Sequence, residues 1–468
     1  MLTYSITGNY TDLYEITMGE VYFKERRQDL PATFDYFFRK LPFGGGYTLF
    51  AGLHELLGVL EDLHFTPEDI AFLRDRGFDA GYLGFLERFR FRGDVYSVPE
   101  GEVIFPGCPV LRVHGTLFET QLVETVLLNI LNFQSLIATK ASRVRQVAGD
   151  RILSDFGLRR AQGAGAMAAS RAAIIGGFNS TSNVAAAEKY DIPVSGTMAH
   201  SFVESYDSEL EAFRAFARSQ PSTCIFLVDT YDTLNSGVPN AITVAKEMEA
   251  LGLKASGVRL DSGDLAWLSG KVRGMLDEAG LNDMKIVVSN QLDEWLVRSL
   301  LDQGAPIDVF GVGTRLVTGH PDAALDGVYK LSQINGEPRI KLSDSLAKTT
   351  LPGIKQVFRV LDADGRFLGF DGVRLDSEEV PAVLYHPFDP HKSTAIGQWK
   401  KQPLVNKVME DGRRLQPEPP LSEIAAYGRE RLGLLPAEYR RFENPHTYKV
   451  GVSERLLHLR DELREKWK

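Results

Sequence analysis

Short apolar runs recur through the middle of the chain, and each is followed by polar or glycine residues and then by a helix-like segment. The predicted strands are residues 152–156, 194–197, 224–228, 255–260, 285–288 and 307–310. The segments with a helical pattern are 166–175, 184–190, 241–251, 265–279 and 293–303. Strands that are apolar on both faces need helices on both sides. The alternation therefore predicts a parallel sheet built from strand–helix units of roughly 30 residues.

The ends of these predicted strands favour a barrel over a dinucleotide-binding sheet. A Rossmann sheet concentrates its glycine fingerprint at the first turn. Here polar, acidic or glycine residues follow every strand, as they do in barrels that keep their site at the carboxyl ends of the strands. We therefore expect an α/β fold, an irregular (β/α) barrel with a flanking α+β domain built from the N- and C-terminal segments.

The two ends of the chain have a different pattern from the middle. Residues 1–150 should form an N-terminal α+β domain, with a strand at 34–38 and one long helix from Leu117 to Val147. The barrel-like catalytic domain would cover residues 151–325. Residues 326–468 should pack with the N-terminal domain, through short strands at 328–334, 339–342 and 358–361 and a helical, charged tail over 421–468.

Charge and composition narrow the class of protein. The 468 residues carry a net charge of −9, which argues against a general nucleic-acid binder but allows a local basic pocket for an anion. Cys108 and Cys224 have neither metal-ligand nor disulfide spacing. Residues 1–4 lack a signal-peptide pattern, and no apolar run approaches the ~18 residues of a membrane span. A cytoplasmic location without membrane contact is therefore expected.

Charged side chains gather at the predicted strand ends. They are Asp229, Asp232, Asp261, Asp264 and Asp293, with Arg159, Arg160, Arg259 and Arg315. Carboxylates without a Cys/His cluster suit Mg²⁺ and ribose hydroxyls better than Zn²⁺, and the backbone of residues 311–314 suits a phosphate. The set indicates a phosphorylated or pyrophosphorylated sugar. The alternative is that the aspartates cap the following helices and pair with the arginines.

Two further basic features allow more than one interpretation. His200 follows the predicted strand 194–197 and would lie on a strand-to-helix loop, where barrel enzymes keep their chemistry, although a lone histidine is more often structural. Lys140, Arg143 and Arg145 end the predicted long helix. They would either place favourable charge at a helix C-terminus or form part of an anion site.

Four segments together resemble the nicotinate phosphoribosyltransferases: Thr11–Tyr14, Phe156–Gly163, Gly196–Phe202 and Val258–Leu265. The resemblance covers most of the chain and thins after about Val360. It implies formation of nicotinate mononucleotide and pyrophosphate from nicotinate and phosphoribosyl pyrophosphate, the first step of NAD salvage from nicotinate. It also implies coupling to ATP hydrolysis through a phosphohistidine, with Mg²⁺ as cofactor. The implied architecture is a type II phosphoribosyltransferase fold in a homodimer with sites at the interface.

The resemblance assigns the expected catalytic residues. His200 would be the phosphorylated histidine, and Asp229 would orient it and stabilise its charge. Arg259 and Asp261 would hold phosphoribosyl pyrophosphate, with Asp261 near the ribose hydroxyls. Asp261 and Asp264 are the expected metal ligands.

The resemblance also assigns the substrate contacts. Phe156 would stack on the pyridine ring, with Tyr14 of the partner subunit on its other face. Arg159 would lie near the ring and the pyrophosphate. The remaining expected contacts are Thr197, Ser182 and Ser289, Gly311, Gly313 and Thr314 at the 5-phosphate, and, as weaker candidates, Lys330 and Lys341 at phosphates.

The segment around Ser182 bears on the choice of substrate. Relatives that use nicotinamide place an aspartate at the corresponding position, and an aspartate there would repel a carboxylate substrate. The sequence therefore favours nicotinate over nicotinamide. A quinolinate-specific enzyme would want more arginines around the ring. A barrel that binds a sugar phosphate without turning it over stays open as the non-catalytic alternative, although five acids and a histidine on one rim do not favour it.

Overall fold

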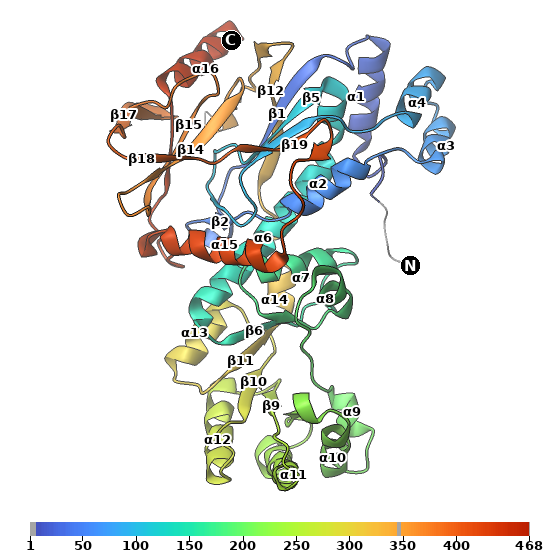
Figure 1. Ribbon diagram of the computed structural model, residues 1–468, viewed down its shortest axis with the longest axis vertical. Helices are drawn as coiled ribbons and strands as arrows, with labels where there is room; N and C mark the ends of the chain where they lie inside the picture. The colour runs from blue at the N-terminus through green and yellow to red at the C-terminus, as the bar shows by residue number, and fades with distance from the viewer. Residues whose placement is uncertain (1–5, 344–347, 468) are drawn as a thin grey trace. The chain divides into compact units, whose positions relative to one another are not determined.

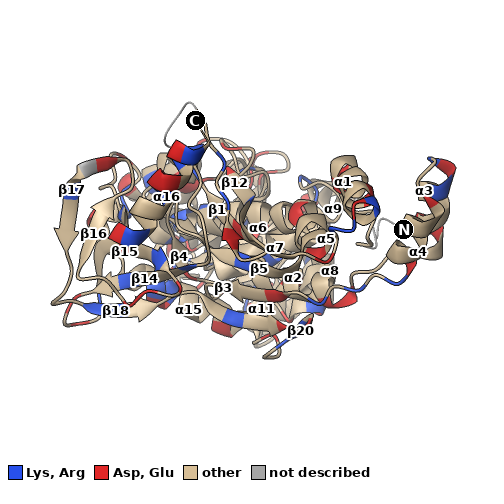
Figure 2. Ribbon diagram, turned by 90° about the horizontal axis from the view of Figure 1, so that it is seen from above, with Lys and Arg blue, Asp and Glu red and all other residues tan. Residues whose placement is uncertain are grey.

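The computed structural model describes residues 6–343 and 348–467. The chain divides into two compact units, one made of Met1–Thr139 with Ala324–Lys468 and the other of Lys140–Ala323. We call them unit 1 and unit 2 and describe each by itself. None of the helices in the described part of the chain is long and apolar enough to cross a membrane. Acidic and basic positions are interspersed along the elements (Figure 2).

Unit 2 contains a six-stranded sheet in which every pairing is parallel (Figure 1). Its order is β7 (Ser180–Thr181), β6 (Ile152–Asp155), β11 (Val309–Val312), β10 (Lys285–Val288), β9 (Gly257–Leu260) and β8 (Ile225–Leu227). In chain order β11 is the last strand and β6 the first, and these two pair with each other, so the strands follow the order of a barrel. Within the described residues it is interrupted only between β7 and β8. The predicted α/β class and the irregular barrel are confirmed.

Helices follow the strands of unit 2 in the alternating manner that the sequence predicts. They are α7 (Gly165–Ile175), α8 (Val184–Tyr190), α9 (His200–Glu204), α10 (Glu209–Ser219), α11 (Val238–Ala250), α12 (Leu265–Glu278), α13 (Glu294–Asp302) and the single turn α14 (Thr314–Val317). A π-helical turn, Thr233–Gly237, precedes α11, and a 3₁₀ turn, Pro221–Thr223, precedes β8.

The predicted strand at 194–197 is wrong. Only one isolated bridge forms there, between Val194 and Thr181, and Val194 is 63% exposed. The following residues are instead used to hold a side chain. Thr197 Oγ1 and Met198 O both accept hydrogen bonds from Arg259. The missing strand coincides with the interruption of the sheet between β7 and β8.

Unit 1 contains a seven-stranded antiparallel sheet. Its order is β13 (Glu337–Pro338), β12 (Gly327–Ile334), β1 (Pro31–Phe38), β5 (Leu111–Thr116), β3 (Asp94–Ser97), β19 (Asn406–Glu410) and β20 (Arg413–Arg414). The strand predicted at 339–342 is wrong, because β12 pairs across Asn335–Gly336 with Glu337–Pro338 instead. Buried aromatic residues such as Phe34 and Tyr36 make β1 the centre of the main core.

The helices of unit 1 precede and follow these strands. They are α1 (Leu13–Lys24), α2 (Leu53–Asp62), α3 (Pro67–Asp75), α4 (Ala80–Glu87), α5 (Leu117–Leu122) and α6 (Glu124–Ala148), whose last turns belong to unit 2. The single helix predicted from Leu117 is therefore two helices separated at Val123. Thr116 and Glu119 form a capping box that starts α5.

A second sheet of six strands completes unit 1. Its order is β17 (Asp389–Ala395), β16 (Val383–His386), β21 (Lys449–Val452), β15 (Phe367–Leu375), β14 (Lys355–Leu361) and β18 (Lys400–Pro403). The helices α15 (Leu421–Leu434) and α16 (Glu454–Lys466) lie in the C-terminal tail, and a two-stranded ladder joins β2 (Thr48–Leu49) to β4 (Val103–Ile104). The tail was predicted to be helical throughout, which is wrong for β21 because this strand fills a place between β15 and β16.

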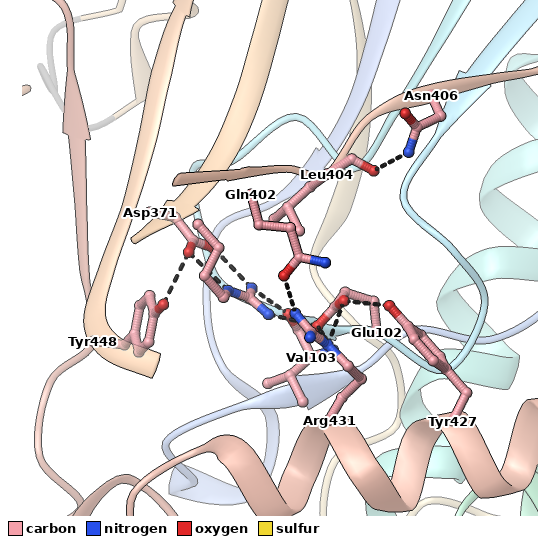
Figure 3. Close-up of polar contacts among 10 residues, drawn as sticks. Glu102, Val103, Asp371, Gln402, Leu404, Asn406, Tyr427, Arg431 and Tyr448 are labelled. Atoms are coloured by element: carbon pink, nitrogen blue, oxygen red, sulfur yellow. Dashed lines mark hydrogen bonds and ion pairs between the residues drawn. The ribbon is translucent and has the colours of Figure 1, made fainter. Parts of the chain in front are cut away.

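A buried network of charges ties the N-terminal and C-terminal segments of unit 1 together (Figure 3). Arg359 of β14 is fully buried and donates to both carboxylate oxygens of Asp371 and to Glu102. Arg431 of α15 donates to Glu102 at 3.0 Å, and the Tyr427 hydroxyl donates to it at 2.7 Å. Two carboxylates and two guanidinium groups balance each other, so the burial of four charges is compensated.

Candidate active site

Arg259, near the end of β9, is the centre of a cluster at the strand ends of unit 2. Its Nε donates to Ser289 Oγ at 3.0 Å and its Nη1 to Thr197 Oγ1 at 2.9 Å. Its Nη2 lies 3.0 Å from Asp261 Oδ1, which also accepts from the Ser289 hydroxyl. The guanidinium carbon lies 5.5 Å from the centre of the Phe156 ring. The structure thus brings together five residues that the sequence assigned to substrate.

Asp229, which follows β8, accepts hydrogen bonds that hold the Asp261 loop of this cluster in place. Its Oδ2 accepts the backbone N–H of Asp261 at 2.7 Å and the Ser262 hydroxyl at 2.8 Å. Its Oδ1 is buried and has no hydrogen-bond partner among the described residues. An unpaired buried carboxylate oxygen is a suitable ligand for a hard cation, so Asp229 and the neighbouring Asp261 fit Mg²⁺.

His200 is the first residue of α9, and its side chain is 40% exposed. Its Nδ1 lies 3.1 Å from Thr230 Oγ1, and its Nε2 lies 3.9 Å from Asp261 Oδ2. The contacts of the His200 ring are thus with Thr230 and Asp261. Asp229 instead accepts a hydrogen bond from the backbone N–H of Asp261 through its Oδ2. The sequence interpretation missed Thr230, although it directly follows Asp229 in the loop after β8.

The turn after β6 holds the residues expected at the pyridine ring. Asp155 is fully buried and accepts hydrogen bonds from the Gly157 N–H, the Ser170 hydroxyl and the Thr181 hydroxyl, at 2.8, 2.7 and 2.8 Å. Its backbone oxygen accepts the N–H of Ser182 at 2.8 Å. Burial raises the pKa of the Asp155 carboxyl, and these donors partly offset it. Sequence analysis missed Asp155, which positions both the Phe156 turn and the Ser182 segment.

Residues 311–314, which the sequence suggested for a phosphate, do not form one loop, because β11 extends to Val312 and α14 begins at Thr314. Gly311 is inside β11, where a Cβ atom would lie 2.4 Å from the Phe156 ring, so its glycine makes room for that ring. Gly313 precedes α14, and Thr314 is its first residue. The first N–H groups of a helix have no acceptor within the helix, so Gly313 and Thr314 stay candidates for a phosphate contact at this single turn.

Several of the acidic residues at the strand ends cap helices, as the alternative interpretation held. Asp232 accepts the N–H groups of Leu234 and Asn235, and Asp264 accepts that of Trp267 at 3.1 Å. Asp293 caps α13, and Arg315 donates to its other oxygen. Helix capping therefore explains why Asp232, Asp264 and Asp293 follow the strands.

No group of three or more metal-ligating side chains occurs in the described residues. Protein ligands for a cation would therefore be one or two carboxylates. Mg²⁺ commonly binds in this way and takes its remaining ligands from substrate phosphates and water.

The basic end of α6 is structural. Lys140 and Arg143 are buried and form ion pairs with Glu294. Arg145 donates to backbone oxygens and to Asn179, at 2.6 Å for the latter contact. Of the other expected contacts in unit 2, Arg159 is exposed on the turn after β6.

Three candidates lie in unit 1. Tyr14 is in the first turn of α1 and is 45% exposed, and burial of its hydroxyl together with Glu124 and Glu15 raises its pKa. Lys330 Nζ lies 3.2 Å from Glu124 Oε1. Lys341 is exposed, and its backbone N–H donates to Thr350 Oγ1.

A parallel sheet in barrel order, whose strand ends present a guanidinium, a carboxylate and hydroxyl groups to one site, is typical of an α/β barrel enzyme that binds an anionic substrate. Three family models match the chain. They are the N-terminal domain of nicotinate phosphoribosyltransferase over residues 10–132, the nicotinate phosphoribosyltransferase family over 152–379, and its C-terminal domain over 354–460.

Individual relatives agree with the family models. The nicotinate phosphoribosyltransferase of Bacillus subtilis is 43% identical over 455 residues, which cover 95% of this chain and 92% of that protein. That of Dictyostelium discoideum is 39% identical and covers 99% and 88%. The crystal structure of human nicotinic acid phosphoribosyltransferase has a TM-score of 0.87 at 34% identity, covering 97% of this chain and 99% of that one. The chain therefore belongs to the nicotinate phosphoribosyltransferase family and is an enzyme of that class.

Proposed function

We propose that the chain transfers the phosphoribosyl group of phosphoribosyl pyrophosphate to the ring nitrogen of nicotinate, as the first step of NAD salvage from nicotinate. The bond from the sugar C1 to pyrophosphate breaks, pyrophosphate leaves with the electron pair, and the ring nitrogen bonds to C1. The observation that carries this proposal is the contact set of Arg259 with Asp261, Ser289 and Thr197 beside the Phe156 ring. A cation, a carboxylate and an aromatic face are the groups that pyrophosphate, ribose and pyridine require.

Each side chain of the cluster has a distinct task in this reaction. Arg259 stabilises the charge that develops on pyrophosphate, because a fixed guanidinium needs no reorganisation as the bond breaks. Asp261 accepts from the ribose hydroxyls. Phe156 stacks on the pyridine ring, while Gly313 and Thr314 bind the 5-phosphate at the start of α14.

Magnesium fits this site through Asp229 and Asp261, and when bound it neutralises charge on the pyrophosphate. The buried, unpaired Oδ1 of Asp229 supports this assignment. Asp264 is the weaker ligand candidate, since its Oδ1 caps α12.

ATP coupling through His200 is the second part of the proposal. The ring is accessible, and the Thr230 hydroxyl next to Nδ1 fixes its orientation. Phosphorylation of His200 places negative charge near Asp261 and Arg259, in the same cluster that binds phosphoribosyl pyrophosphate. Transfer from ATP forms the N–P bond with release of ADP, and hydrolysis of the phosphohistidine later releases inorganic phosphate.

The site is proposed to be completed in a homodimer. Tyr14 of the partner subunit would cover the second face of the pyridine ring opposite Phe156. The partial exposure of this aromatic residue at the start of α1 supports the proposal, because an interface would bury it.

Product formation by the purified chain tests the function. Nicotinate mononucleotide should form from nicotinate and phosphoribosyl pyrophosphate, faster with ATP, and γ-labelled ATP should label the protein. His200→Asn should abolish the labelling and the ATP stimulation but leave slow, ATP-independent synthesis, because Arg259 and Asp261 remain. Undiminished labelling of this variant would exclude His200 as the phosphoryl acceptor, and absence of product with the unmodified chain would exclude the activity.

A further inference from the structure

A groove of about 550 Å³ lies in unit 1, and none of the residues assigned to the reaction lines it. Its walls come from the segment after α4, from the start of β1 and from the end of β5. Three arginine residues contribute to the wall, namely Arg88, Arg90 and Arg92. The volume is within the range of small-molecule sites, which is about 300–1,000 Å³.

The three arginine side chains lie on one side of an anchored segment. Burial alternates along residues 88–93, with the arginines exposed and the residues between them buried. Phe89 fixes the segment to the core, because its ring packs edge-on against Phe118. The backbone N–H of Arg92 donates to Glu119 Oε1 at 2.7 Å. The guanidinium groups are therefore presented to the groove by a backbone that packing and hydrogen bonding hold in place.

None of the three guanidinium groups forms an ion pair with a carboxylate in the described part of the chain. Glu87, which precedes Arg88, lies 3.8 Å from Arg74 instead. Arg90 donates to the backbone oxygen of Phe89 at 2.5 Å, a contact that leaves its charge uncompensated. Arginines without a carboxylate partner keep N–H donors available for an anionic ligand.

The other titratable groups of the wall do not cancel this charge. Glu119 uses both carboxylate oxygens within the fold, Oε1 for the N–H of Arg92 and Oε2 for the N–H and hydroxyl of Thr116. Asp29 is exposed at the edge of the groove. Burial lowers the pKa of the His114 ring, so it is neutral at pH 7. Three arginines thus outnumber two carboxylates, in a chain whose net charge is −9.

The charge and the volume together determine the kind of ligand. Guanidinium groups bind phosphate through paired N–H donors, and a ligand that reaches three of them needs several anionic groups. The acidic balance of the whole chain disfavours a nucleic acid as the occupant. We propose that this groove binds a linear triphosphate group, either as free triphosphate or as part of a nucleotide, with one guanidinium for each phosphate.

Protection of arginine side chains against phenylglyoxal locates the binding, because this reagent modifies accessible guanidinium groups. The full-length chain reacts with it in the presence of tripolyphosphate, ATP or orthophosphate, and modified peptides are quantified by mass spectrometry. At about ten times the midpoint concentration of tripolyphosphate, Arg88, Arg90 and Arg92 should react about tenfold more slowly. Orthophosphate at the same concentration should change their rates by less than about twofold, because one phosphate reaches fewer guanidinium groups.

The remaining arms of the experiment identify the source of the triphosphate and control for non-specific binding. Equal protection by ATP assigns the groove to nucleotides, whereas protection by tripolyphosphate alone assigns it to free triphosphate. Arg455 of α16 is the matched control, because it is exposed and forms no ion pair in the described part of the chain. Its rate of modification should not change with any of the three compounds.

Variants separate the groove from the site proposed for the reaction. Arg90→Gln/Arg92→Gln should raise the tripolyphosphate concentration that protects Arg88 about a hundredfold, or about tenfold for each charge-assisted contact. Asp261→Ala should leave the protection unchanged. Absence of protection, equal protection of Arg455, equal protection by orthophosphate, or undiminished protection of Arg88 in the double variant would each overturn the proposal. Because the test measures no turnover, its result is independent of the proposed function.

Discussion

Replacement of Glu102 by glutamine tests whether the buried charge network holds unit 1 together. Glu102 is fully buried and accepts from Arg359, Arg431 and the Tyr427 hydroxyl (Figure 3). Glutamine keeps the side-chain volume but removes the negative charge. It also places an N–H₂ donor among groups that all donate to position 102. Breaking one partner of a buried ion pair costs about 3–5 kcal/mol.

The structure places the expected cost at the lower end of this range. Arg359 keeps its two contacts with Asp371, and Arg431 keeps its contact with Gln402, so neither guanidinium becomes isolated. We therefore expect a loss of about 3 kcal/mol in the free energy of unfolding. At about 2 °C per kcal/mol for a domain of this size, the melting temperature should fall by about 6 °C.

The pH dependence has a definite sign. Burial alone would raise the pKa of the Glu102 carboxyl, but Arg359 and Arg431 outweigh it and hold the pKa below its ordinary value of 4.5. A lowered carboxyl pKa stabilises the fold above the unfolded-state value, and this contribution is lost as the pH falls through the folded-state pKa. The difference between the unmodified chain and Glu102→Gln should therefore be full at neutral pH and shrink below about pH 4.5.

Scanning calorimetry measures the effect on the whole chain, and hydrogen exchange of α15 measures it in unit 1. Glu410→Gln is the matched control, because it removes an exposed carboxylate that pairs with Lys407 and should change stability by less than about 0.5 kcal/mol. If Glu102→Gln stayed within the range of this control, the network would not stabilise unit 1.

Three other changes test the site. Ser182→Asp should reduce the use of nicotinate and begin to admit nicotinamide, measured as the ratio of kcat/KM values; comparable turnover of both by the unmodified chain would refute the specificity argument. Mixed dimers of Tyr14→Ala and Asp261→Ala chains, each inactive alone, should regain activity, and verified mixed dimers without activity would contradict an interfacial site. Thr230→Val should slow labelling of His200 about tenfold, with Thr230→Ser restoring it, as expected from loss of one hydrogen bond; unchanged labelling would remove Thr230 from this role.

The parts of the site that the sequence predicted are those that follow from strand order. Arg259 lies near the end of its predicted strand, Asp261 and Ser289 directly follow theirs, and the carboxyl ends of neighbouring parallel strands must meet at one edge. The structure places β9 beside β10, and the three side chains are in hydrogen-bond contact. Strand order was sufficient to place Arg259 and Asp261 at one edge, whereas Ser289 was assigned to the site through the family resemblance.

What the sequence missed depends on side-chain direction in loops. Asp264 and Asp293 look identical to Asp261 in a strand-end pattern, yet they turn toward the helices that follow them. Thr230, in the loop after β8, contacts His200 at the start of α9, and a strand-end pattern does not predict a contact between two such loops. Residues 194–197 are Val-Ser-Gly-Thr, so only Val194 is apolar and Gly196 weakens a strand, while Thr197 accepts a hydrogen bond from Arg259.

On the proposed mechanism, Asp261 is the residue through which the state of His200 reaches the sugar site. Its Oδ1 accepts from Arg259 and Ser289, while its Oδ2 lies 3.9 Å from His200 Nε2. Phosphorylation adds a dianionic group near this carboxylate, and like charges at such a separation repel. The phosphoryl group also attracts Arg259 away from Asp261. Since ATP can favour substrate binding only through a difference in affinity between the two states, the shared Arg259–Asp261 pair supplies the physical coupling that the reaction needs.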